Sequence, residues 1–139
     1  MDVHTPAQRR ANMAAIRGRD TKPEMVIRRL VHGMGFRYVL HSPNIPGRPD
    51  LLLPRHKKVI LVHGCFWHVH RCRFGRVTPV TNAAFWATKR AATVTRDRTV
   101  LRDLRSLGFR VLVVWECQVR NPTRIIACLW RFLSQSDGI

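Results

Sequence analysis

The chain has 139 residues, 45% of them apolar, and a formal net charge of +17 from 25 Lys and Arg against 8 Asp and Glu. This length predicts a single domain over residues 1–139 with a real hydrophobic core, which excludes a disordered chain and a disulfide-dependent scaffold. No apolar run approaches the roughly 18 residues of a membrane span, and no apolar secretion signal opens the chain, so we expect a cytoplasmic protein. The charge is spread along segments that look folded, which favours a basic face that binds nucleic acid.

Two helices are expected at the start of the chain. Thr5-Pro6 indicates a helix over about 5–17. The stretch Thr21-Lys22-Pro23-Glu24 has the spacing of a capping box, in which Thr21 and Glu24 each meet a free backbone N–H. Apolar residues at helical spacing then continue to Gly35.

A sheet is expected in the middle of the chain. Residues 36–40 alternate like a strand, and a loop rich in Pro and Gly follows over 41–49. Two short apolar runs, 50–53 and 59–62, are separated by Pro54-Arg55-His56-Lys57. This pattern predicts a hairpin.

The remaining elements are two helices and one strand. Thr81-Asn82 starts a long helix that reaches Leu107, and Gly108 closes it. Residues 109–115 are apolar almost throughout, as in a strand buried on both faces. A last helix opens at Asn121-Pro122. Its apolar side holds Ile125, Ile126, Leu129, Phe132 and Leu133. The order of elements predicts an α/β fold in which helices flank a central mixed sheet.

The densest group of potential metal ligands lies in residues 62–72, which hold three His and two Cys directly after a strand. Thiolates and imidazoles together are typical of structural zinc. The spacing predicts a closed tetrahedral site made of Cys65, His70, Cys72 and Cys117. The alternatives are His63 or His68 in place of His70, or free thiols without a metal. Cys128 lies in the apolar last helix and is expected to be a core residue.

Asp50 is the carboxylate that neither a helix cap nor a helix surface explains. It stands at the start of an apolar strand, where a carboxylate is costly unless it is paired or binds a metal. One account is an ion pair with Arg48 or another Arg. The other is a Mg²⁺ ligand, because Mg²⁺ commonly uses one or two carboxylates together with water and phosphate. In that case His63 and His68 are candidates for activating water or protonating a leaving group.

Large aromatic residues stand in or near the basic loop that follows this sheet. Phe66-Trp67 lies within the loop, and Trp86 lies near the start of the long helix. Apolar side chains beside a basic surface can wedge between base steps, and core packing is the alternative. We expect Phe85 to be a core residue, whereas spacing leaves both options open for the other three.

Taken together, these residues resemble the very-short-patch repair (Vsr) endonuclease family, which nicks DNA at T:G mismatches. The resemblance runs in order over residues 3–117. Its matching strings are Asn12-Met13 with Ile16, Arg19-Asp20-Thr21 with Glu24, Pro46-Gly47-Arg48-Pro49-Asp50, His63-Gly64-Cys65-Phe66-Trp67-His68 with His70 and Cys72, Phe85-Trp86, Arg96-Asp97-Arg98, and Leu107-Gly108 before Arg110-Val111-Leu112-Val113-Val114-Trp115-Glu116-Cys117. The basic loop 73–78, which contains Gly75, and residues 91–93 depart from the family pattern.

The resemblance implies a restriction-endonuclease-like fold and a nick on the 5′ side of the mismatched T that deamination of 5-methylcytosine creates. It implies that Asp50 binds Mg²⁺ together with the backbone carbonyl of Val62. His68 would activate the attacking water, and His63 would support the scissile phosphate or the metal's water ligands. Glu24 would lie near this site, although its helix-capping role accounts for it equally well.

The resemblance also implies the zinc ligands that the spacing predicts, and it makes Phe66, Trp67 and Trp86 the wedge beside the mismatch. The expected partners are double-stranded DNA with a T:G mismatch, mismatch-repair coordinator proteins and a repair polymerase. A nucleoid-associated monomer without membrane contact is expected. Two alternatives stay open: a zinc-stabilised DNA-binding module without catalysis, and a nickase of the same fold with a different site specificity.

Overall fold

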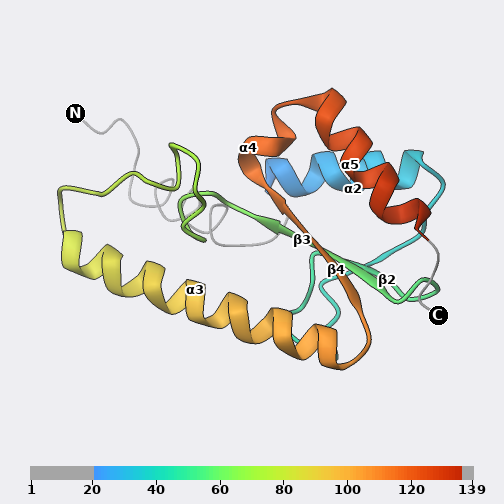
Figure 1. Ribbon diagram of the computed structural model, residues 1–139, viewed down its shortest axis with the longest axis horizontal. Helices are drawn as coiled ribbons and strands as arrows, with labels where there is room; N and C mark the ends of the chain where they lie inside the picture. The colour runs from blue at the N-terminus through green and yellow to red at the C-terminus, as the bar shows by residue number, and fades with distance from the viewer. Residues whose placement is uncertain (1–20, 136–139) are drawn as a thin grey trace, which may run out of the picture.

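A four-stranded mixed sheet lies at the centre of the computed structural model, which describes residues 21–135 (Figure 1). Its strands, in spatial order, are β1 (Val39–Leu40), β2 (Leu51–Leu53), β3 (Lys58–His63) and β4 (Arg110–Trp115). The first three strands pair antiparallel, and β4 pairs parallel to β3. The predicted hairpin and the mixed sheet are therefore confirmed, while the helix expected over 5–17 lies outside the described residues.

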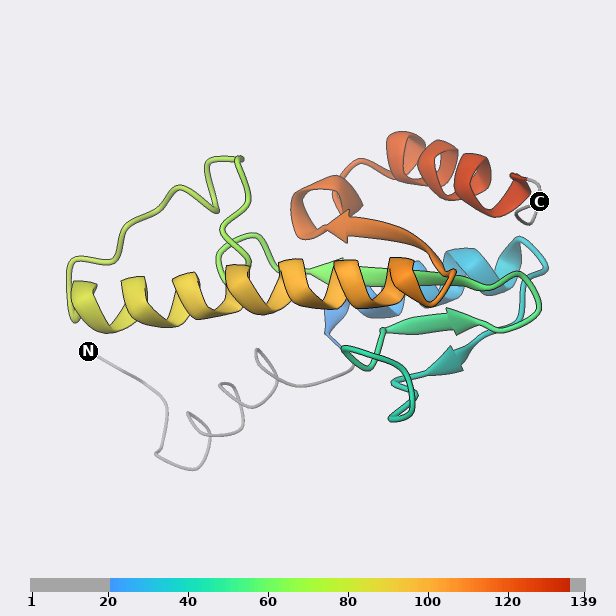
Figure 2. The same cartoon turned by 60° about the horizontal axis from the view of Figure 1, so that its bottom comes forward.

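Helices cover both faces of this sheet. Helices α2 (Lys22–Gly33) and α5 (Pro122–Ser134) pack on one face, and the long α3 (Ala83–Ser106) runs along the other (Figures 1 and 2). A short helix, α4 (Glu116–Val119), follows β4 directly and was not predicted. Among residues 21–135, no helix is both long enough and apolar enough to cross a bilayer.

The sheet divides the core into two clusters because successive strand residues point to opposite faces. The cluster under α2 and α5 contains Ile27, Val31, Leu51, Leu53, Ile60, Val114, Ile125, Leu129, Phe132 and Leu133. The cluster under α3 contains Leu52, Val59, Leu61 and Leu104. Full burial of one such Leu or Ile stabilises the fold by about 1.5–3 kcal/mol, so these contacts fix the position of each helix on the sheet.

The predicted helix starts are confirmed, but of the capping box predicted for Thr21 and Glu24 the structure shows only the bond that Thr21 accepts, because the Glu24 carboxylate contacts Arg28 and His41. The Thr21 hydroxyl accepts a hydrogen bond from the Glu24 N–H at 3.4 Å, and the Asn121 side chain accepts one from the Arg124 N–H at 3.2 Å. Asn82 precedes α3 in a left-handed conformation, with φ of 55°, and caps it without a side-chain bond. The side chains of Thr21 and Asn121 thus each satisfy one free backbone N–H group in the first turn of the helix that follows.

Three expectations at the margins of the core are wrong. The first strand comprises two residues rather than the five of 36–40, because the Phe36 N–H turns back to bond the Val31 carbonyl at the end of α2. Strand β4 is an edge strand in which Val114 is buried and its neighbours are partly open, rather than a strand buried throughout. Ile126 is 42% exposed because it faces away from the sheet.

Cys128, which was expected in the core, lies in α5 and is partly buried, so it stands at the margin of the core.

A buried lysine secures the end of α5. Lys58, the first residue of β3, is fully buried, and its Nζ donates to the carbonyls of Leu133 at 3.2 Å and Gln135 at 2.8 Å. The ammonium also lies 5.6 Å from the centre of the Phe132 ring. A cation is favourable at a helix C-terminus, where carbonyls lack intrahelical partners. Lys58 therefore attaches α5 to the sheet at the end opposite His63.

Candidate active site and metal centre

An open cleft of about 1310 Å³ lies between the start of α2, the loop before β2, the end of β3 and the middle of α3. Glu24, Asp50, His63, His68 and Trp67 all line it, so the structure brings together candidates from four separate segments. The cleft is also lined by the basic residues Lys22, Arg48, Lys89 and Arg96. Cations around a few acidic groups favour a polyanionic ligand over a neutral one.

Asp50 is held at the base of this arrangement by the hairpin. Its Oδ2 accepts a hydrogen bond from the Val62 N–H of β3 at 2.7 Å. The loop before it packs tightly on α3, since a Cβ on Gly47, whose φ is +76°, would lie 2.5 Å from a methyl of Val100. Among the described residues, no ion pair joins Asp50 to Arg48 or to another Arg, so that account of the carboxylate is wrong.

The carboxyl of Asp50 lies beside that of Glu24. Burial, followed by the hydrogen bond and negative charge of Glu24, raises the pKa of Asp50 from 3.8 to about 8. Two carboxyl groups that share a site of low dielectric resist joint ionisation unless a cation compensates them. This donor set therefore fits a hard divalent cation, and the bond from Val62 brings that residue's backbone to the same place.

Glu24 is 2% exposed and combines two roles. Its backbone N–H donates to the hydroxyl of Thr21, which caps α2. Its carboxylate contacts the guanidinium of Arg28 and lies 3.3 Å from Nε2 of His41. Polar atoms of Glu24, His41 and Asp50 lie within 4.8 Å of one another. Sequence reasoning missed Arg28 and His41. The four-residue spacing of Glu24 and Arg28 was a signal for that pair, whereas the Pro/Gly-rich loop gave no signal for His41.

The two candidate histidines form a stacked pair. The rings of His63 and His68 are 3.8 Å apart at their centres and nearly parallel. Burial, and then the charge of His68, lowers the pKa of His63 from 6.5 to about 4, so this imidazole is neutral at pH 7. Its Nδ1 is buried without a hydrogen-bond partner among the described residues. A buried polar atom of this kind is suited to a bound water or phosphate oxygen.

Asp97 on α3 orients the second histidine. Its Oδ2 lies 2.6 Å from Nδ1 of His68. The carboxylate accepts this bond, so Nδ1 carries the hydrogen and Nε2 keeps a free lone pair. Sequence analysis gave Asp97 no role, although an acid between Arg96 and Arg98 in a strongly basic chain was a signal that it has a specific partner.

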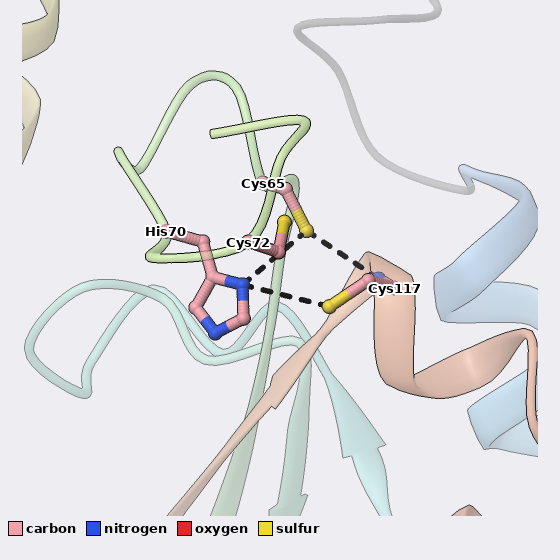
Figure 3. A group of neighbouring side chains, drawn as sticks. All are labelled: Cys65, His70, Cys72 and Cys117. Carbon is pink, nitrogen blue, oxygen red and sulfur yellow. Dashed lines mark hydrogen bonds between the residues drawn. The ribbon is translucent and has the colours of Figure 1, made fainter. Parts of the chain in front are cut away.

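The four predicted zinc ligands meet at one point, where the loop after β3 approaches the turn from β4 into α4 (Figure 3). Nδ1 of His70 lies 3.5 Å from Sγ of Cys117 and 3.8 Å from Sγ of Cys65. A tetrahedral zinc ion, about 2.3 Å from sulfur and about 2.0–2.1 Å from nitrogen, separates such ligands by about 3.6 Å. The residues present therefore fit zinc, with His70 rather than His63 or His68 in this group.

The surroundings of the cysteines also suit a metal. All four cysteines of the chain are free. Against the effect of burial, hydrogen bonds from His70 and from the backbone of Gly75 lower the pKa of Cys72 to about 6, whereas burial raises the pKa of Cys65 to about 12. Gly75 is required here because a Cβ would lie 2.0 Å from the His70 carbonyl oxygen. A thiol that ionises readily beside an imidazole is a good zinc ligand.

The three proposed wedge residues form one aromatic group beside the cleft. The rings of Phe66, Trp67 and Trp86 contact one another edge to face, with centres 5.3–5.6 Å apart. All three are partly exposed. Phe85 is 52% exposed and lies against Trp86, so the expectation that it is a core residue is wrong. It faces outward because this end of α3 extends beyond the sheet (Figure 2).

Comparison with known proteins gives a consistent result. The family model described as DNA mismatch endonuclease Vsr matches residues 1–74. The DNA mismatch endonuclease Vsr of Escherichia coli is 42% identical over 124 residues, which cover 89% of this chain and 79% of that protein. The type II nicking enzyme V.XorIIP of Xanthomonas oryzae pv. oryzae is 38% identical over 135 residues, covering 97% and 98%. The type II nicking enzyme V.NmeAIP of Neisseria meningitidis is 38% identical over 120 residues, covering 86% and 85%.

Proposed function

Because the chain belongs to the Vsr family of DNA mismatch endonucleases, we propose that it nicks duplex DNA on the 5′ side of the mismatched T in a T:G pair. The reaction is Mg²⁺-dependent hydrolysis of a phosphodiester in very short patch repair. The observation that carries this proposal is the meeting of Asp50, Glu24, the stacked His63–His68 pair and an aromatic group in one basic cleft. The fold we assign is restriction-endonuclease-like, a single domain over residues 1–139.

The two metals have separate duties in this proposal. Zn²⁺ held by Cys65, His70, Cys72 and Cys117 is structural, because four protein ligands leave no open position for substrate. Mg²⁺ would be held by Asp50 and the backbone carbonyl of Val62, with Glu24 beside them. When bound, it would stabilise the negative charge that develops at the reacting phosphate and would favour ionisation of a nearby water. The closeness of the Asp50 and Glu24 carboxyls, with Glu24 buried, supports a cation there, because a cation would relieve the repulsion between them.

His68 is the general base. The Asp97 bond at 2.6 Å fixes Nδ1 as the protonated nitrogen, so Nε2 accepts a proton from the attacking water. The water oxygen bonds to the phosphorus while the P–O bond to one sugar oxygen breaks. The leaving sugar oxygen takes a proton from solvent water in the open cleft, and His68 returns its extra proton to solvent. His63 stays neutral and offers its unpartnered nitrogen to a phosphate oxygen or an ordered water. Asp97 is a positioning residue that acts through His68.

Selectivity arises from the aromatic group. A T:G pair unstacks at lower cost than a normal pair, and unstacking costs a few kcal/mol per base step. Phe66 and Trp67, which line the cleft, would enter beside the mismatch with Trp86 behind them. Lys89 and Arg96 lie in the same cleft and provide phosphate contacts that carry no sequence information.

The test uses a short duplex with one central T:G mismatch and a different label on each strand. A matched duplex carries T:A at the same position. We expect a nick in the T strand alone, with T:G alone, and with Mg²⁺ present. Nicking of both duplexes at equal rates would reject mismatch selectivity, and equal rates with and without added Mg²⁺ would reject the metal assignment.

One of the alternatives is less favoured by the comparisons. A binding module without catalysis conflicts with relatives that are all named as endonucleases or nicking enzymes. A nickase of different site specificity has support in the relatives named type II nicking enzymes. Varying the bases that flank the T:G pair separates it from the leading proposal. Action with mismatch-repair coordinator proteins and a repair polymerase, as a cytoplasmic monomer, belongs to the same proposal.

A further inference from the structure

Arg90 joins α3 to both ends of the loop that follows β3. It lies one helical turn after Trp86, and its Nε donates to the Phe66 carbonyl at 2.9 Å. Its Nη1 donates to the Val77 carbonyl at 2.9 Å, and its Nη2 donates to the carbonyl of Gly75. The guanidinium also lies over the Phe66 ring, with its central carbon 4.6 Å from the ring centre. One side chain thus holds three backbone carbonyls and one aromatic face.

The loop that Arg90 holds has little other regular structure. Residues 64–82 contain neither helix nor strand. Phe66 and Trp67 come from this loop, whereas Trp86 comes from α3, so the aromatic group spans two segments. Among residues 21–135, Asp97 of α3 reaches this loop through the side chain of His68, whereas Arg90 of α3 bonds the backbone of the loop, at Phe66 itself and at two later residues. The relative position of the three rings therefore depends on the side chain of Arg90.

These contacts use the shape of a guanidinium and not its charge alone. Its planar fork sends N–H groups in several fixed directions while its face stacks on a ring. A lysine ammonium is a point charge that cannot make the same fork and stack. None of the partners of Arg90 among the described residues is acidic, so the contacts are geometric. Lysine at this position is a sharp test, since it keeps the charge and loses the geometry.

We propose that Arg90 determines mismatch selectivity as a positioning residue that holds Phe66 and Trp67 against Trp86. This inference rests on the proposed function, in which these rings enter beside the mismatch. A ring that is already fixed loses little entropy when it inserts, whereas a mobile ring must be ordered first. Loosening the group therefore weakens the T:G complex, where insertion occurs, and leaves the T:A complex nearly unchanged.

The experiment compares Arg90→Lys with Arg102→Lys, a matched control at an exposed position of the same helix. Both proteins are used as zinc-loaded full chains, after zinc content and melting temperature are measured. Single-turnover nicking and binding are measured on T:G and T:A duplexes. Near-ultraviolet circular dichroism reports the Trp67–Trp86 contact, with Trp86→Phe as the reference for its loss. Phe66→Leu and the double variant Arg90→Lys/Phe66→Leu complete a cycle.

We expect Arg90→Lys to lower the T:G to T:A ratio at least about tenfold, the size of one lost base–aromatic stack. Arg102→Lys should leave that ratio unchanged. The dichroism of Arg90→Lys should approach that of Trp86→Phe, and the double variant should lose no more selectivity than its larger single variant. An unchanged ratio, additive losses, or loss of zinc in Arg90→Lys would overturn the inference, the last because Arg90 would then hold the metal loop instead. If the wild type shows no mismatch preference, the proposed function fails, and the dichroism still decides whether Arg90 positions the rings.

Discussion

Asp50 is the residue on which the proposed chemistry depends most directly. Asp50→Asn keeps the size of the side chain and an oxygen for the Val62 N–H, but it removes the charge that would hold a cation. We expect nicking to fall by about 10³-fold or more, since a catalytic metal supplies several kcal/mol to the transition state. DNA binding without Mg²⁺ should change little. Asp103→Asn, on the exposed side of α3, is the control, and retained nicking in Asp50→Asn would remove this residue from the mechanism.

The buried carboxyl also predicts a dependence of stability on pH. The pKa of Asp50 in the folded protein, about 8, lies above its ordinary value of 3.8. Its contribution to stability is therefore complete below 3.8 and is lost as the pH rises through about 8. His63, with a folded-state pKa of about 4, acts in the opposite sense as the pH falls below 6.5. The difference between the wild type and Asp50→Asn isolates the Asp50 contribution between pH 6.5 and 8.5.

Melting temperatures of the zinc-loaded protein without added Mg²⁺ test this dependence. We expect the wild type to lose stability relative to Asp50→Asn as the pH rises from 6.5 to 8.5. Added Mg²⁺ should raise the wild-type melting temperature more at pH 8.5 than at pH 6.5. Parallel curves for the two proteins would mean that the carboxyl titrates normally.

Asp97 acts through the histidine that it orients. Asp97→Asn keeps a side chain of the same shape but presents an amide to Nδ1 of His68, which favours the wrong tautomer or rotamer. We expect the single-turnover rate to fall by about 10²–10⁴-fold, the range for loss of general-base catalysis, while KM changes little. His68→Ala and the double variant Asp97→Asn/His68→Ala should have similar single-turnover rates, because Asp97 acts only through His68. If the fold-losses of the two single variants multiplied in the double variant, Asp97 and His68 would act independently and Asp97 would not be a positioning residue for His68.

At the scale of elements, the proposed zinc ion would take the place of regular structure in the loop after β3. The loop after β3 has no ladder of backbone bonds, and its fourth proposed ligand, Cys117, belongs to α4. We expect metal removal, or Cys117→Ser, to lower the melting temperature by 10 °C or more, since about 1 kcal/mol corresponds to a few degrees in a chain of this size. Cys128→Ser is the control because Cys128 lies outside the cluster. An unchanged melting temperature after stripping would exclude a structural zinc.

The elements that could be predicted are those whose sequence signals are local. The capped starts of α2 and α5, the hairpin and the closing Gly108 all follow from patterns within a few residues. Phe85 and Ile126 were misplaced because a helical pattern gives a face but not the extent of the sheet beneath it. The meeting of Cys65, His70, Cys72 and Cys117 was predictable because thiolates and imidazoles have few other uses at such density. Asp97, Arg90 and His41 were not, because their partners come from distant segments.

At the scale of the whole molecule, the chain carries a net charge of +17, and Lys22, Arg48, Lys89 and Arg96 line the cleft that contains Asp50 and Glu24. Each phosphate contact should contribute about 0.9 to the slope of log K against log salt. We expect Arg96→Ala to reduce the magnitude of this slope by about 1 on T:G and T:A duplexes alike, since phosphate contacts carry no sequence information. Fluorescence anisotropy over a salt series measures both slopes. A loss confined to the T:G duplex would give Arg96 a role in reading the mismatch.

The parallel pairing of β3 with β4 has a consequence for how the chain reaches its structure. Val62 pairs with Val114, and the Cys117 N–H bonds Cys65 Sγ across 52 positions of sequence. Folding must close this long loop before the pairing stabilises anything, and such non-local contacts slow folding. If Cys65 and Cys117 bound the same zinc ion early in folding, the ends of β3 and β4 would be held close together. The refolding rate of this enzyme should therefore rise with zinc concentration, which makes metal supply a kinetic determinant of its maturation.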